Sequence, residues 1–176
     1  MSVSQYYQQM RRLALEKRAE YQITTDTLNL TAVRKIYKIE RVRIDSWDIK
    51  GRKIKAAYFC DDTDSSVLVN KNLPKTPRLF ALVHELKHHY TDQESIRGGK
   101  LQCGDYNANQ ITEVGAELFA AEFIYPESEM KQLAEELNIW AGACTPEKII
   151  EFKRLCPATV SYIFLVKRFE WFNFIG

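Results

Sequence analysis

Residues 84–88 of the chain read His84-Glu85-Leu86-Lys87-His88, two histidines four residues apart with a glutamate directly after the first. On an α-helix, residues i and i+4 lie on one face about one turn apart, so both imidazoles can bind the same metal ion. Glu85 lies about 100° further round the helix, within reach of a water molecule that the metal activates. The segment therefore predicts a zinc site with His84 and His88 as ligands and Glu85 as the catalytic base.

The residues around this motif have the pattern of a helix. Thr76-Pro77 is typical of a helix start, with an N-cap followed by proline at the first helical position. Apolar side chains then recur at helical spacing through the motif itself, at Leu79, Leu82, Val83 and Leu86. The alternative is a buried helix whose histidines are only hydrogen-bonded core groups, and the pattern favours it less than a metal site.

Length and composition predict one globular domain covering residues 1–176. Hydrophobic residues make up 45% of the chain and charged residues 27%, as in ordinary soluble proteins. The sequence contains neither an apolar run long enough to span a membrane nor the apolar core of a secretory signal, so we expect a cytoplasmic protein without a membrane partner. Its four scattered cysteines are expected to be free thiols.

The charge is distributed unevenly along the chain. Residues 1–60 contain 13 Lys and Arg against 6 Asp and Glu, a net charge of +7, whereas residues 61–176 contain 12 against 17, a net charge of −5. The basic residues of the first third are dispersed through helix and strand patterns, which is typical of solvated faces. Direct nucleic-acid binding is therefore considered but not favoured.

Periodicity divides the chain into four regions. Helical spacing dominates residues 1–40, and alternation and turn residues predict a small sheet in 41–70. The motif helix, a loop and a second helix occupy 77–125. Further helices fill 127–176, and Thr145-Pro146, an N-cap followed by proline, predicts the start of one of them. The expected strands are 42–47, 54–59 and 66–69, and the expected loop is 92–109. The fold class predicted is α+β: mainly helical and zincin-like, with a three-stranded antiparallel sheet next to the motif helix.

A catalytic zinc generally takes three protein ligands, so one more is needed. His89 points about 100° away from the face that His84 and His88 share. Cys103 could supply a thiolate, although that would resemble a structural site more closely. The predicted helix 111–124 is the better source, because Glu113 and Glu117 lie one turn apart on it among small apolar residues. The residues leave open which of the two binds the metal and which orients an imidazole.

Two blocks of sequence together resemble a known family. His84-Glu85-Leu86-Lys87-His88, followed by Glu113-Val114-Gly115-Ala116-Glu117-Leu118-Phe119-Ala120-Ala121 and closed by Tyr125-Pro126, is similar to the paired signature of the ImmA/IrrE metallo-endopeptidases. The resemblance implies a cytoplasmic, gluzincin-like zinc peptidase, with His84, His88 and Glu113 on Zn²⁺ and Glu85 as base. Many relatives have glycine where this chain has Lys87, and we expect the lysine side chain to face solvent.

The resemblance also implies a function. We expect a zinc-dependent endopeptidase that hydrolyses a peptide bond in a protein substrate, and in relatives this is commonly a helix-turn-helix repressor of a mobile element or stress response. These 176 residues have no room for such a DNA-binding domain, so the repressor should be a separate partner. The alternative is a non-proteolytic regulatory protein that uses the same fold to bind a repressor or toxin. A tyrosine is expected to stabilise the oxyanion, with Tyr90, Tyr106 and Tyr125 as candidates.

Overall fold

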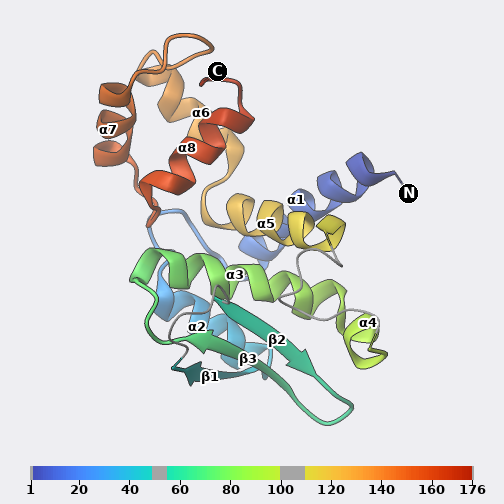
Figure 1. Ribbon diagram of the computed structural model, residues 1–176. Coiled ribbons are helices and arrows are strands. Elements are labelled where there is room, and N and C mark those ends of the chain that lie inside the picture. Colours follow the sequence, from blue (N-terminus) through green and yellow to red (C-terminus); the bar gives the residue numbers. More distant parts are fainter. Residues whose placement is uncertain (1, 49–54, 100–109, 176) are drawn as a thin grey trace.

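The computed structural model describes residues 2–48, 55–99 and 110–175 (Figure 1). Within these residues, two helices come first, three short strands follow, and the rest of the chain is helical. In chain order the elements are α1 (Val3–Glu20), α2 (Leu30–Ile39), β1 (Arg43–Trp47), β2 (Ala56–Cys60), β3 (Ser65–Asn70), α3 (Lys75–Thr91), α4 (Gln93–Arg97), α5 (Gln110–Ile124), α6 (Glu127–Glu136), α7 (Pro146–Leu155) and α8 (Tyr162–Trp171). Mainly helical with one small sheet, the chain has the α+β fold class that the sequence predicted.

Helix α3, which carries the histidine motif, runs through the middle of the molecule. Figure 1 shows the sheet and α2 on one side of α3 and helices α1 and α5 on the other. Helices α6, α7 and α8 gather beyond the C-terminal end of α5. Because elements pack around α3 on several sides, even its polar residues are buried, including Glu85, Lys87, His88 and His89.

The predicted apolar stripe of α3 is confirmed as core. Leu79, Leu82, Val83 and Leu86 are each at most 1% exposed. The expected start of the helix was wrong, because α3 begins at Lys75 after Pro74 and no side chain caps it. Pro77 is consequently the third residue of the helix, where its missing N–H still costs nothing because the first four amides of a helix have no partner within it.

The sheet is mixed rather than antiparallel. Its strand order is β1-β3-β2, with β1 parallel to β3 and β2 antiparallel to β3. The predicted antiparallel meander was wrong because β3, the last strand in sequence, takes the centre. Val67 and Val69 of β3 are buried, whereas β1 is largely exposed and forms an edge. The turn between β2 and β3 is held by Asp61, whose carboxylate accepts from the backbone N–H groups of Thr63 and Asp64 at 2.7 and 2.8 Å.

Among the described residues, side-chain caps mark four of the helix starts. They are Ser2 for α1, Asn29 for α2, Thr145 for α7 and Ser161 for α8. The Thr145-Pro146 start of α7 was predicted as such from sequence and is confirmed. The expected loop 92–109 was wrong in its first part, because residues 93–97 form α4. Residues 100–109 of that expected loop, and residue 54 of the expected second strand, lie outside the described residues.

A buried carboxylate joins four helices around the end of α5. Glu122 on α5 accepts from Arg168 of α8 at 3.2 Å and from Arg11 of α1 at 3.3 Å, and the Glu127 backbone N–H of α6 donates to it at 3.0 Å. Glu122 and Arg168 are 4% and 5% exposed. This ionic cluster fixes the C-terminal helices to the part of the chain that carries α3 and α5.

We predict that Arg168→Met lowers the free energy of unfolding by about 3 kcal/mol, because Glu122 would stay buried with only one cationic partner. Arg43→Ala is the matched control. Its ion pairs with Asp45 and Asp64 are on the surface, and such pairs contribute about 0–1 kcal/mol. Urea unfolding of both variants measures the difference, and equal losses would contradict a stabilising role for the cluster.

Candidate metal centre

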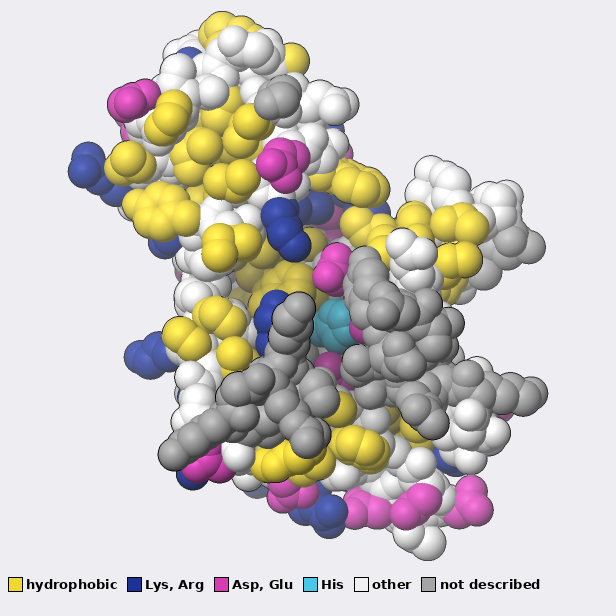
Figure 2. Space-filling model, viewed as in Figure 1, with side chains coloured by type: hydrophobic (Ala, Val, Ile, Leu, Met, Phe, Trp, Pro, Cys, Tyr) yellow, Lys and Arg dark blue, Asp and Glu magenta, His cyan; other side chains and the backbone are white. Residues whose placement is uncertain are grey.

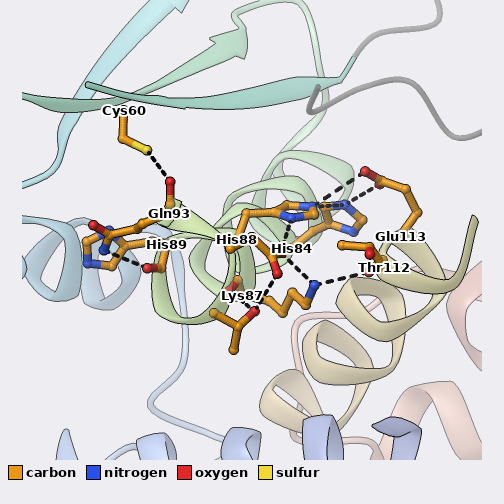
Figure 3. Close-up of polar contacts among 10 residues, drawn as sticks. Cys60, His84, Lys87, His88, His89, Gln93, Thr112 and Glu113 are labelled. Atoms are coloured by element: carbon orange, nitrogen blue, oxygen red, sulfur yellow. Dashed lines mark hydrogen bonds and ion pairs between the residues drawn. The ribbon is translucent and has the colours of Figure 1, made fainter. Parts of the chain in front are cut away.

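The two motif histidines converge on one point, as their spacing predicted. The Nε2 atoms of His84 and His88 lie 3.3 Å apart on one side of α3 (Figure 3). His88 is fully buried, whereas the His84 side chain is 15% exposed. In Figure 2, histidine atoms are visible in the middle of the face shown, recessed between the C-terminal helices and the sheet. The imidazole pair is therefore reachable from solvent on the His84 side.

Glu113, in the first turn of α5, points its carboxylate at both imidazoles (Figure 3). Its Oε2 lies 3.0 Å from His84 Nε2 and its Oε1 lies 3.6 Å from His88 Nε2. Burial alone would raise the pKa of Glu113, but the hydrogen bond to His84 and the charges of both imidazoles hold this pKa below its ordinary value. Burial lowers the pKa of His84, but Glu113, Glu85 and Glu117 outweigh it and the net shift is upward.

Asp92, which the sequence analysis missed, orients His88. It follows the last residue of α3, and its Oδ2 lies 2.7 Å from His88 Nδ1. Because an ionised carboxylate can only accept, Nδ1 of His88 carries the proton and the lone pair of Nε2 faces His84 and Glu113. Burial raises the pKa of Asp92, but His88 and Lys87 lower this pKa by more, and it stays below its ordinary value. A carboxylate four residues after His88 was the signal that could have identified it.

Glu85 lies beside this group without belonging to it. It is 5% exposed, and its Oε2 has no hydrogen-bond partner among the described residues. Burial raises the pKa of Glu85, whereas the charges of His84 and His88 lower it. The nearby charge of Glu113 raises this pKa further, and the backbone N–H of Tyr58 lowers it. The net shift is upward. The carboxylate is thus desolvated and has an oxygen free to accept a proton.

The residues fit a metal ion. One ligand atom from each of His84, His88 and Glu113 lies within 4.8 Å of the others. The two Nε2 atoms, 3.3 Å apart, and the Glu113 carboxylate converge on one point, and the buried Oε1 of Glu113 lacks a hydrogen-bond partner among the described residues. A cation bound there would replace the proton that joins His84 Nε2 to Glu113. Two imidazoles and one carboxylate are a donor set typical of catalytic zinc.

The other ligand candidates are placed differently. Glu117 is exposed and stays outside the His84, His88 and Glu113 group, although its charge acts on His84. His89 points away from the face that His84 and His88 share, as expected (Figure 3). Its Nδ1 lies 3.0 Å from the Tyr58 hydroxyl and its Nε2 lies 3.2 Å from Glu40. Cys103 lies outside the described residues.

The tyrosines proposed for oxyanion stabilisation do not join the cluster. The Tyr90 hydroxyl donates to the Tyr21 hydroxyl at 3.2 Å, and Tyr125 is buried with its ring against Phe152. Among the described contacts, neither side chain touches His84, His88 or Glu113. Tyr106 lies outside the described residues.

Lys87 does not face solvent, so that expectation was wrong. Its side chain is fully buried, and its Nζ donates to Asp92 Oδ2 at 2.6 Å and to the Thr112 carbonyl oxygen at 3.2 Å. Spacing along α3 could not reveal this, because the residues that enclose Lys87 come from other elements.

A comparison with protein families shows which family the chain belongs to. Residues 34–143 match the family model of the IrrE N-terminal-like domain, a family of peptidases. The chain belongs to this family. The matched segment begins within α2, includes the sheet, α3, α5 and α6, and leaves out α1, α7 and α8. The resemblance to the ImmA/IrrE family, inferred from the two sequence blocks, is thereby confirmed. The chain is a metallopeptidase-family protein.

Two further findings concern the relatives of this chain and its helices. No curated protein matches its sequence significantly. Among the residues that the structure describes, no helix has the length and apolar character needed to span a membrane.

We predict that Glu113→Gln removes most bound zinc, whereas Glu117→Gln retains about one ion per chain. The amide is a much poorer ligand than the carboxylate, and we expect a loss of affinity above about 100-fold, the upper range for losing only an outer hydrogen-bond partner. The two residues lie one turn apart on α5, so each variant is the control for the other. Elemental analysis after purification without chelator measures the metal; retention by Glu113→Gln with loss in Glu117→Gln would reverse the assignment.

Proposed function

We propose that the protein is a zinc-dependent endopeptidase that hydrolyses a peptide bond in a protein substrate, with a separate helix-turn-helix repressor as the substrate class. The observation that carries this proposal is the convergence of His84, His88 and Glu113 beside a buried Glu85 whose Oε2 is unpartnered among the described residues. Membership of a peptidase family supports the reaction type. The repressor is proposed from the resemblance to the ImmA/IrrE proteins.

His84, His88 and Glu113 would hold the zinc ion, and Asp92 would keep His88 in the tautomer whose Nε2 lone pair is available. Bound there, zinc would supply Lewis-acid chemistry, polarising a peptide carbonyl and making a water molecule more acidic. Because His84 is partly exposed, a substrate could approach the three ligand residues from the His84 side.

Glu85 would act as the general base and then as the general acid. Its free Oε2 would accept the proton of the attacking water and afterwards deliver it to the leaving amine. The Tyr58 backbone N–H of β2 acts on the same carboxylate and would help to hold it in place. Desolvation of Glu85 suits the first of these steps, because a carboxylate with a raised pKa is a stronger base and accepts a proton more readily.

We predict that Glu85→Gln keeps its zinc but cleaves at least about 10²–10⁴-fold more slowly, the range for losing a general acid–base group. The amide preserves the shape of the side chain and cannot accept the proton. The substrate to use is a purified helix-turn-helix repressor from the same organism, with products identified by mass spectrometry and metal by elemental analysis.

The same assay separates the alternative, a regulatory protein that binds a repressor or toxin without cutting it. Wild-type protein that binds the repressor stoichiometrically and leaves it intact, with or without added zinc, would favour that alternative. Cleavage by Glu85→Gln at the wild-type rate would refute the role of Glu85, and wild-type protein without zinc would refute the metal centre.

A further inference from the structure

Lys87 presents a buried positive charge directly beneath the candidate metal centre. Its side chain has no solvent exposure, and moving an ammonium group out of water costs several kcal/mol unless its N–H groups find partners. Three residues from different parts of the chain surround this ammonium. They are Asp92, which directly follows α3, Thr112 of α5 and Tyr6 of α1. The site that encloses Lys87 is therefore well built.

Two of these partners support the candidate ligands. The same Oδ2 atom of Asp92 lies 2.6 Å from Lys87 Nζ and 2.7 Å from His88 Nδ1. Thr112, whose carbonyl oxygen accepts from Lys87 at 3.2 Å, directly precedes Glu113 in α5. The labelled side chains in Figure 3 show the Lys87 ammonium reaching from α3 to Thr112, beside Glu113. One ammonium thus connects the carboxylate that orients His88 with the backbone that carries Glu113.

The third partner comes from outside the segment that matches the family model. Tyr6 lies on α1, and Lys87 Nζ is 5.6 Å from the centre of its ring, within the range of a cation–π contact. The ring can lie there because position 115 on α5 is glycine: a Cβ at Gly115 would be 2.6 Å from Tyr6 Cε1. Tyr6 therefore covers the ammonium from a helix that the family match does not include.

We propose that Lys87 is a positioning residue of the metal centre, holding Asp92 on His88 and the first turn of α5 at the distance at which Glu113 meets both imidazoles. This inference rests on the proposed metal-dependent function. Without the ammonium, Asp92 would keep only His88 and the Thr91 hydroxyl, which donates to its other oxygen at 3.0 Å. Among the described contacts, its connection to α5 would then run only through His88, whose Nε2 lies 3.6 Å from Glu113 Oε1. The ligands would still be present, but the distance between α3 and the start of α5 would be less firmly set.

The test is metal binding by Lys87→Met, which keeps the length of the side chain and removes its charge and donors. We expect the affinity of the metal-free protein for Zn²⁺, measured by competition with a chromophoric chelator, to fall about 10–100-fold, as when an outer partner of a metal ligand is lost. The absorption spectrum of the Co²⁺-substituted protein should change, because it reports the geometry of the ligands. Lys75→Met is the matched control: Lys75 is exposed on the same helix, and its variant should match wild type in both measurements.

Unfolding of the metal-free variants in urea separates positioning from a purely structural role. If Lys87→Met lowers only the free energy of unfolding while its Zn²⁺ affinity and Co²⁺ spectrum equal those of wild type, the proposal is wrong. Lys87→Gln retains an N–H donor and is the second variant. We expect its affinity to lie between those of wild type and Lys87→Met, and an affinity equal to wild type would overturn the proposal even if Lys87→Met did not fold. Wild-type protein that binds no metal would instead refute the proposed function.

Discussion

Helix α3 is enclosed on several sides, and the polar groups that are buried on it must therefore find partners inside the protein. Glu85, Lys87, His88 and His89 are all buried. Desolvating such groups without partners costs several kcal/mol each, so their surroundings are strongly constrained. The sheet and α2 supply Tyr58 and Glu40 to His89, while Asp92 and α5 supply acceptors to Lys87 and His88. The positions of α2, α5 and the sheet around α3 follow in part from these pairings.

Two of the buried atoms that this arrangement leaves unsatisfied lie beside the motif histidines. Glu85 Oε2 and Glu113 Oε1 have no hydrogen-bond partner among the described residues, and the Nε2 atoms of the two histidines lie 3.3 Å apart. Around them, Asp92 is fully engaged. A rigid, paired surround with unpaired atoms at its centre is what a binding site for a cation requires, because the ion replaces the missing partners without any rearrangement.

Much of the fold could be predicted from local pattern, and the errors share one cause. Apolar periodicity located α3 and its core residues, and Thr145 identified the start of α7, because both signals act between residues close in sequence. The strand order was wrong because three short strands in a row permit both a meander and a sheet with β3 at its centre. The choice depends on which strand pairs along both of its edges, and in this chain it is the valine-rich β3, whereas β1 is largely exposed at one edge.

For the candidate site, the sequence by itself determined that His84 and His88 face the same point, since helix geometry fixes the relation of residues four apart whatever surrounds them. It also placed Glu85 beside them and directed His89 about 100° away from the face that they share. Only the tertiary structure decided that Glu113 rather than Glu117 meets the imidazoles, and that Lys87 is buried. These outcomes depend on how α5 and α1 are rotated and shifted against α3, and that is set by packing among residues far apart in the chain.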